Sequence, residues 1–211
     1  MSPRFGPDFQ QELGDLLAWR RDVRHFRSDP LEEELVAELL RAAQLAPSVG
    51  NSQPWRFVRV RSGELREALA AHADAEIARA GAAMPEDRHP AYCALKLHGL
   101  REAPELIAVF CDDATPVGGR LGAATMPETR GFSVVLAVHT LWLAARARGL
   151  GLGWVSVVEP GHVTRLLDVP QDWRLIALLC LGHPLEEDHV PELERRGWQA
   201  RLDWRANVSE R

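Results

Sequence analysis

Apolar residues recur at helical spacing across residues 31–43, and most of the positions between them are polar or charged. The residues of this apolar face are Leu31, Leu35, Val36, Leu39, Leu40 and Ala43. Such spacing predicts a helix with one buried side, capped by Ser28 or Asp29 and ended by Pro47. The segment "WRFVRVR", residues 55–61, alternates apolar and basic residues instead, which predicts a strand with one face in water.

The same patterns divide the rest of the chain. Further helices are predicted over residues 7–19, 63–80, 91–101, 131–149 and 160–168, and further strands over 105–113, 151–159 and 173–184. No internal repeat or low-complexity linker interrupts them. The chain therefore reads as one α+β domain over residues 1–211, with about four strands of mixed direction and helices on both faces of the sheet.

Two segments have more apolar surface than a monomer needs. The helix predicted over residues 131–149 is apolar nearly all round, which is typical of a central helix or of one buried in an interface. The tail "LERRGWQARLDWR", residues 193–205, is rich in arginine and tryptophan and fits no buried core element. Both features predict contacts outside the chain's own fold, in a homodimer.

Composition narrows the class of protein. The 211 residues include 46% hydrophobic and 26% charged positions, as in an ordinary globular domain, and the formal charge of −5 argues against a general nucleic-acid binder. Cys93, Cys111 and Cys180 lie far apart, so no disulfide framework or metal motif is expected. The first residues lack a basic start followed by an apolar run, so we expect no signal peptide and a cytoplasmic location.

The segment "RRDVR", residues 20–24, places a carboxylate among arginines directly after the first predicted helix. Arg20, Arg21 and Arg24 could bind phosphate oxygens, or they could form a solvated basic patch, which is the better interpretation of these residues alone. Asp22 could orient the arginines through salt bridges, or it could accept a proton while they keep it ionised.

The segment "APSVGNSQPW", residues 46–55, joins a predicted helix to a predicted strand and gathers Ser48, Asn51 and Gln53. These residues can form a hydrogen-bonded turn in which Gly50 relieves strain. They can also offer a hydroxyl and two carboxamides to a flat polar ligand. The second interpretation gains weight beside a phosphate-binding arginine cluster.

Other short motifs predict no chemistry. In "GLGLGW", residues 149–154, the spacing is wrong for a dinucleotide fingerprint and the motif precedes a strand, so we interpret it as a helix C-cap and a turn. The segment "GRLGAAT" lacks the lysine of a P-loop, and Ser156 is not in a hydrolase elbow. The eight histidines form no zinc motif, so no metal is expected.

Taken in order, "RRDVR", "APSVGNSQPW", "TMPET", an apolar helix, "GLGWVS" and "GWQAR" resemble the nitroreductase-like flavoproteins. The similarity extends over about residues 18–201. Asp22, the segment "LKLHGLREAPELIAVFCD" and the serine of "GWVS" resemble most closely the BluB branch, the aerobic 5,6-dimethylbenzimidazole synthases. The resemblance implies a mainly antiparallel sheet in an intertwined homodimer, with a lid over residues 69–100 and a tail from about residue 185 that wraps the partner.

The resemblance also implies a cofactor site. In such proteins the residues matching Asn51 and Gln53 face the flavin, and those matching Arg20, Arg21, Arg24 and Arg201 hold the phosphate and the pyrimidine edge of the ring. The implied FMN site comprises Arg20, Arg21, Asp22, Val23, Arg24, Ser48, Asn51, Gln53, Ser156 and Arg201. The two FMN sites would lie at the dimer interface.

The implied activity consumes the flavin. Reduced FMN is the substrate, supplied by a separate flavin reductase, and molecular oxygen is the co-substrate. The products are 5,6-dimethylbenzimidazole, the lower ligand of vitamin B12, and erythrose 4-phosphate. Asp22 would act as acid and base beside the ribityl chain, and Ser156 would offer a hydroxyl near the ring.

Three other functions stay open on the sequence. The first is an NAD(P)H-dependent nitroreductase that recycles FMN, and the second is a reductive dehalogenase of the iodotyrosine deiodinase type. The third is a non-catalytic flavin-binding protein. Asp22 and Ser156 favour the synthase over the first two, and both would be idle in the third.

Overall fold

The fold is seen in a computed structural model that describes residues 5–211. A four-stranded sheet forms its centre, from β1 (Trp55–Arg59), β2 (Glu105–Asp112), β3 (Gly151–Val155) and β4 (Trp173–Gly182). The strand order is β1-β2-β4-β3, and all three pairings are antiparallel. The expected α+β class with a mainly antiparallel sheet is confirmed. The parallel component of the described residues is one isolated bridge, from Asp22 to Leu152.

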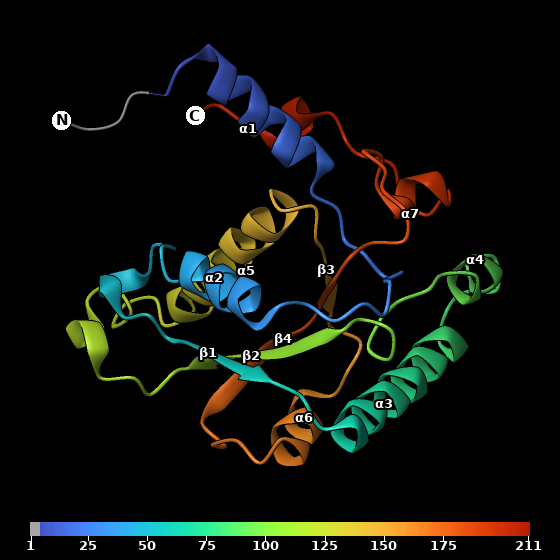
Figure 1. Cartoon of the computed structure of the whole chain (residues 1–211), viewed down its shortest axis with the longest axis horizontal. Coiled ribbons are helices and arrows are strands. Elements are labelled where there is room, and N and C mark those ends of the chain that lie inside the picture. The colour runs from blue at the N-terminus through green and yellow to red at the C-terminus, as the bar shows by residue number, and fades with distance from the viewer. Residues whose placement is uncertain (1–4) are drawn as a thin grey trace.

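Helices cover both faces of the sheet, as expected (Figure 1). The helices are α1 (Pro7–Trp19), α2 (Glu33–Ala43), α3 (Gly63–Ala82), α4 (His89–Cys93), α5 (Thr129–Arg146), α6 (Pro160–Leu166) and α7 (Glu192–Arg195), and the 3-10 turns are η1 (Val49–Asn51), η2 (Val117–Arg120) and η3 (Trp204–Asn207). Helices α2 and α5 pack on one face, and α3 and α6 pack on the other.

The two cores divide the side chains of the central strands between them. Leu178 and Leu179 are neighbours in β4 and fully buried, yet they belong to opposite cores, because successive strand residues point to opposite faces. Helix α5 is central to the first core, where Val138 and Leu141 are fully buried. The predicted burial of this apolar helix is thus confirmed for one of its sides.

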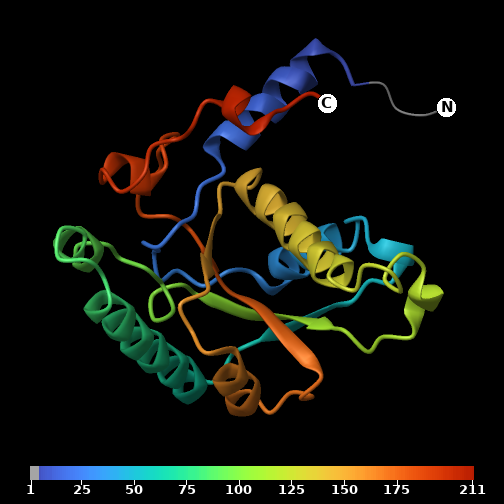
Figure 2. The same ribbon diagram turned by 180° about the vertical axis from the view of Figure 1, so that it is seen from behind.

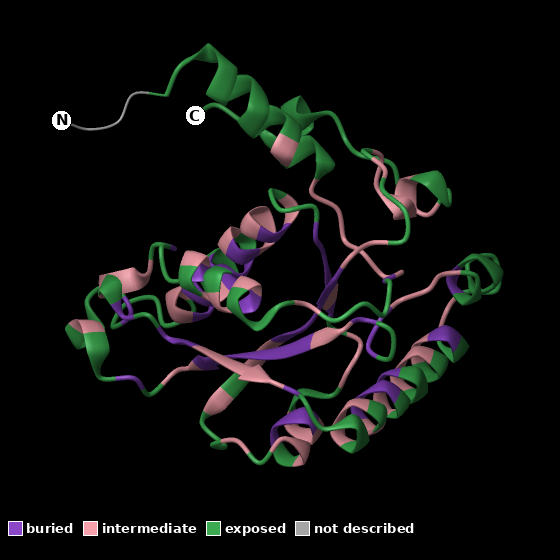
Figure 3. Ribbon diagram, in the orientation of Figure 1, coloured by how far each residue is buried: buried purple, intermediate pink, exposed green. Residues whose placement is uncertain are grey.

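Helix α1 and the last residues of the chain lie outside both cores. The two views show them side by side above the sheet layers (Figures 1 and 2). None of the residues of α1 is buried, although Phe9, Leu17 and Trp19 are large and apolar (Figure 3). Within the described residues, no helix has both the length and the apolar character needed to cross a membrane.

Two local predictions were wrong. Helix α2 begins at Glu33 rather than after Ser28 or Asp29, because Arg27 Nε binds the Asp29 carboxylate at 2.7 Å and occupies the expected cap. The helix expected over residues 91–101 ends at Cys93. After it, the guanidinium of Arg66 in α3 donates to the carbonyls of Leu100, Ala103 and Pro104, which holds this irregular segment against α3.

The segment after α1 lies along the free edge of β3. The backbone N–H of Val23 donates to the carbonyl of Leu152 at 3.1 Å. A Cβ at Gly151 would meet the Val23 side chain at 2.7 Å, and one at Gly153 would overlap the Val23 carbonyl oxygen. Gly149, at φ +70°, lies two residues beyond the C-cap Ala147, in the turn that follows α5, and its N–H donates to the carbonyl of Arg146 at 3.0 Å. Gly151 and Gly153 have a different role, because their lack of a side chain lets the segment at Val23 approach the strand.

Replacing Gly153 by alanine is expected to lower the free energy of unfolding by roughly 1–3 kcal/mol, because the added methyl overpacks the contact with Val23. Gly14 in α1 has open space around it, so Gly14→Ala is the matched control and should not destabilise. Urea denaturation measures both. A Gly153→Ala variant as stable as the parent would contradict the close packing of this segment on β3.

Candidate functional site

A cluster of arginines surrounds a cavity where the tail crosses the segment after α1. Arg20, Arg21, Asp22, Arg24, Pro191, Glu192, Leu193 and Arg201 line this cavity, which measures about 210 Å³. The structure therefore brings Arg201, near the end of the chain, to the arginines of "RRDVR". Four guanidinium groups face two carboxylates, so the cavity has an excess of positive charge suited to an anion such as a phosphate group.

Arg20 shows how crowded these cations are. Burial is the main cause that lowers the pKa of its guanidinium, and the nearby charge of Arg201 lowers it further, while Asp22 opposes both. The guanidinium also stacks over the ring of Trp142, 4.7 Å from the ring centroid. An anionic ligand would relieve this repulsion, which favours a binding role for Arg20 and Arg201.

Both carboxylate oxygens of Asp22 are held by the protein. Oδ1 accepts a hydrogen bond from the backbone N–H of Trp154 at 2.8 Å. Oδ2 accepts from Arg24, at 3.0 Å from Nε and 2.9 Å from Nη2. Burial nevertheless raises the pKa of Asp22, although Arg24 and the Trp154 N–H act in the opposite direction. Asp22 is thus a fixed carboxylate with an increased affinity for a proton, as an acid/base group requires.

Ser156 follows β3 directly. It lies two residues beyond Trp154, on the strand whose edge carries Asp22, and its side chain is exposed. Its hydroxyl makes no hydrogen bond within residues 5–211. Ser156 lines neither of the two cavities that Asp22 lines.

The joint between α2 and β1 is a strained turn. Ser48 Oγ accepts from the backbone N–H of Gln53 at 3.1 Å, and the Gln53 amide lies 3.4 Å from Asn51 Oδ1. The simple turn interpretation is thus correct in part. However, φ is 52° at Asn51 and 44° at Gln53, in the left-handed region. Strain at two residues with exposed amides is typical of functional loops.

The structure does not bring this joint to the arginine cluster within one chain. The backbone N–H of Val49 donates to Ser133 Oγ near the start of α5 at 3.0 Å. Trp142 Nε1, later in the same helix, donates to the carbonyl of Arg21 at 3.2 Å. Because a helix rises about 1.5 Å per residue, roughly 13 Å of helix axis separates the two contacts. The predicted site residues therefore form two groups.

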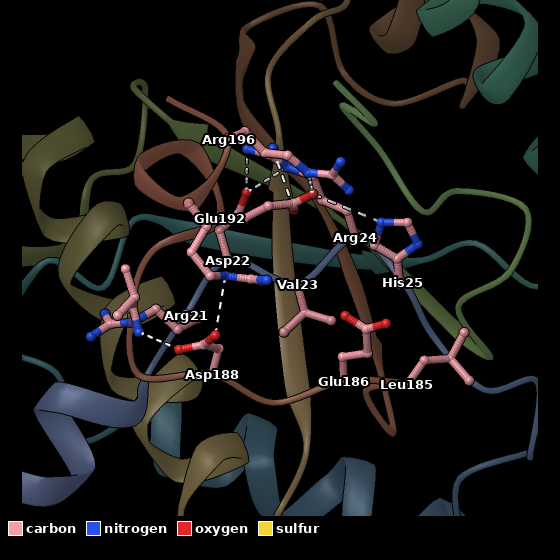
Figure 4. Close-up of a pocket in the computed structure, with 12 residues that line it drawn as sticks. Arg21, Asp22, Val23, Arg24, His25, Leu185, Glu186, Asp188, Glu192 and Arg196 are labelled. Atoms are coloured by element: carbon pink, nitrogen blue, oxygen red, sulfur yellow. Dashed lines mark hydrogen bonds and ion pairs between the residues drawn. The ribbon is translucent and has the colours of Figure 1, made fainter. Parts of the chain in front are cut away.

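The beginning of the tail contacts its own chain. Arg21 Nε donates to the carbonyl of His189 at 2.8 Å, and a second cavity of about 150 Å³ separates residues 185–196 from residues 21–25 (Figure 4). Farther on, Arg88 stacks 4.1 Å over the ring of Trp198, next to Tyr92 of α4. The tail thus touches the predicted lid, while its wrapping of a partner stays a prediction.

Sequence reasoning missed three residues of this region: Trp142, Trp154 and Glu192. Trp142 and Trp154 position the "RRDVR" segment, one through its ring N–H and the other through its backbone N–H. Glu192 of α7 faces Arg24 in Figure 4. The one available signal was the pair Gly151 and Gly153 at alternate positions of a strand, which indicates a close backbone neighbour. In residues 5–211 no three His, Cys, Asp or Glu side chains gather to hold a metal.

Comparison with known proteins decides the family. The model of the family described as "Nitroreductase family" matches residues 17–183. The chain belongs to the nitroreductase family. A 5,6-dimethylbenzimidazole synthase of Rhodospirillum rubrum is 61% identical to it over 94% of each chain, and one of Rhodobacter capsulatus is 47% identical over 94% of this chain and 96% of its own. The resemblance to that branch is confirmed.

Solved structures support the same fold. A crystal structure of oxidized iodotyrosine deiodinase, bound to FMN and 3-iodo-L-tyrosine, superposes with a TM-score of 0.69 at 28% identity. It covers 83% of this chain and 91% of its own. A nitroreductase-like protein from Streptococcus mutans reaches a TM-score of 0.68 at 21% identity, over 95% and 98% of the two chains, which shows the fold alone.

Asp22→Asn is expected to be at least as stable as the parent at pH 7. Because burial raises the pKa of Asp22 in the folded state, the parent loses stability as pH rises from the unfolded value of 3.8 through the folded pKa. The asparagine side chain does not titrate. The difference in the free energy of unfolding between variant and parent should therefore grow over this pH window and vanish below it. Urea denaturation from pH 4 to 8 checks this, and a stability difference between variant and parent that stays constant over this range would contradict the raised pKa.

Proposed function

We propose that this chain is a 5,6-dimethylbenzimidazole synthase, which converts reduced FMN and oxygen to 5,6-dimethylbenzimidazole and erythrose 4-phosphate. The observation that carries the proposal is Asp22, a fixed carboxylate of raised pKa beside an arginine-lined cavity. Synthases that are 61% and 47% identical along nearly the whole chain support it. A separate flavin reductase would supply the substrate.

The residues present fit FMN. The excess of guanidinium charge around Arg20, Arg21, Arg24 and Arg201 suits a phosphate group. Reduced FMN and oxygen supply the redox chemistry. Asp22, held at both oxygens, takes and returns a proton beside the ribityl chain, and the free hydroxyl of Ser156 donates to or accepts from the ring side.

The site is completed by a second copy of the chain. Ser48, Asn51 and Gln53 lie away from the arginine cluster of their own chain, which supports the proposal that a partner supplies them. The outer side of α5 offers the surface for this contact, since Phe132, Val135 and Leu136 are exposed by 53%, 42% and 44%. Helix α1, which has no buried residue, adds a second apolar face.

Asp22→Asn tests the acid/base role, because it keeps the shape of the side chain and removes its ability to take a proton. We expect FMN still to bind and the reduced flavin still to be oxidised in air. Formation of dimethylbenzimidazole should fall by roughly 10²–10⁴-fold, the usual contribution of a positioned proton-transfer group. Product chromatography after mixing with reduced FMN measures this.

Two outcomes would count against the proposal. An undiminished yield from Asp22→Asn would show that Asp22 only orients the arginines. A parent protein that forms no dimethylbenzimidazole, but oxidises NADH with a nitroaromatic acceptor, would establish the ordinary nitroreductase instead.

Arg201→Ala should weaken FMN binding by roughly ten- to a hundredfold, the effect of losing one charged hydrogen bond. Binding of riboflavin, which has no phosphate, should change little. Arg205→Ala is the matched control, since Arg205 is on the same tail but pairs with Asp203 and lines none of these cavities. Flavin fluorescence measures all these affinities, and equal losses with both ligands would place Arg201 away from the phosphate.

The protein should be a dimer at micromolar concentration, through an interface of more than about 2,000 Å². Leu136→Glu places a charge on the outer side of α5 and should shift the equilibrium toward monomers. Light scattering measures the mass of both proteins. A stable folded monomer of the parent would overturn this assembly.

A further inference from the structure

Glu192 is a half-buried carboxylate that the proposed reaction does not yet use. It begins helix α7, and its side chain is only 14% exposed. Two guanidinium groups and an imidazole lie around it: Arg24 Nη1 at 3.9 Å, Arg196 Nε at 3.6 Å and His25 Nε2 at 3.9 Å (Figure 4). None of these distances is a hydrogen bond. Glu192 thus lies between two guanidinium groups without being fixed to either of them.

One of the three guanidinium nitrogens of Arg24 does not bind Asp22 and lies on the side of Glu192. Its Nε and Nη2 hold Oδ2 of Asp22 at 3.0 and 2.9 Å. Its third nitrogen, Nη1, is buried and has no hydrogen-bond partner in residues 5–211. A buried unpaired donor is costly, and a displacement of about 1 Å toward Glu192 would satisfy it. One guanidinium is therefore shared unequally by two carboxylates.

We propose that Glu192 is a positioning residue for Arg24, and that its attraction determines how tightly Arg24 holds the carboxylate of Asp22. The proposal rests on the acid/base role given to Asp22 above. Glu192 does not touch the flavin in this account. It acts through Arg24 on the proton affinity of the group that does the chemistry.

The sign of the effect follows from the charges that face each group. Arg24, Arg20 and the Trp154 N–H lower the pKa of Asp22, while burial raises it. Cys180 lies behind Asp22 and stays a neutral thiol, because burial raises its pKa to about 12. A negative Glu192 draws Arg24 away and opposes its effect. When the charge of Glu192 is removed, Arg24 is attracted by Asp22 alone, so the pKa of Asp22 should fall.

Helix α7 also links this adjustment to the tail. The tail carries both Glu192 and Arg201, and both line the arginine cavity. By packing here, the tail thus supplies two groups to the cavity. Arg201 would bind the phosphate, and Glu192 acts on Arg24. An acid/base group works best with a pKa near the working pH, and Glu192 keeps Asp22 from being held too firmly in its ionised form.

The test measures the titration midpoint of Asp22 by ¹³C NMR of protein labelled at its aspartate carboxyl groups, with Asp22→Asn to assign the signal. Glu192→Gln should lower the midpoint by roughly half a unit to one unit. Glu186→Gln is the matched control, because Glu186 lines the cavity beside Arg24 but makes no ion pair within the described residues. Equal midpoints in parent and Glu192→Gln, or equal shifts in both variants, would overturn the proposal.

A second variant tests the opposite direction. Arg196 is 55% exposed, so Arg196→Gln should fold. It removes a competitor for Glu192, which then draws Arg24 more strongly, and the midpoint of Asp22 should rise. A fall or no change would contradict the proposal even if Glu192→Gln were too unstable to study.

The activity provides a separate check. The acid limb of the pH profile of dimethylbenzimidazole formation should move to lower pH in Glu192→Gln. Glu192→Asp, which keeps the charge, should move it less. A parent that forms no dimethylbenzimidazole would refute the proposed function, whereas the midpoint of Asp22 would still decide the role of Glu192.

Discussion

The contact between the "RRDVR" backbone and the glycine-bearing edge of β3 is the constraint on which the site depends. Val23 can approach the strand only because Gly151 and Gly153 lack a side chain at this point. Once the segment lies there, the N–H of Trp154 reaches Asp22, and Arg20, Asp22 and Arg24 face the same cavity. A sheet edge thereby fixes charged groups more firmly than a free loop could.

This arrangement lowers the stability of the fold, and the chemistry proposed for the site gives the reason for that cost. Strong pairing with a cation ordinarily offsets the cost of burying a carboxylate. Asp22 pairs with Arg24, yet its pKa stays raised. The joint at Asn51 and Gln53 is strained as well, with positive φ at both residues. Backbone strain and unfavourable burial thus both occur in the two groups to which the function is assigned, although positive φ is also found at Arg120 and Asp168.

The pattern of the sequence predicted much of this fold, because periodicity reports burial directly. It predicted a strand over residues 105–113 and an apolar helix over residues 131–149, where the structure has β2 at Glu105–Asp112 and α5 at Thr129–Arg146. It failed where a distant side chain holds an irregular segment, as Arg66 does after α4. Propensity contains no information about such distant contacts.

The site was predicted as a set of residues but not as an arrangement. The motifs named Asp22, Ser156 and the arginines, yet spacing alone could not show that Trp154 holds Asp22 or that Glu192 faces Arg24. Nor could it show that Ser48, Asn51 and Gln53 lie apart from the arginines of their own chain. The separation along α5 is a tertiary property, and it is the reason why the site is assigned to two chains.

Complementation between two variants tests this shared site most directly. One chain carries Asp22→Asn, and the other carries Ser48→Ala, Asn51→Ala and Gln53→Ala together. Random exchange of subunits makes half of the dimers mixed, and each mixed dimer has one intact site of two, so about a quarter of the parent's dimethylbenzimidazole formation should return. If the mixture forms no more product than the two variants do separately, each site belongs to a single chain and the account is wrong.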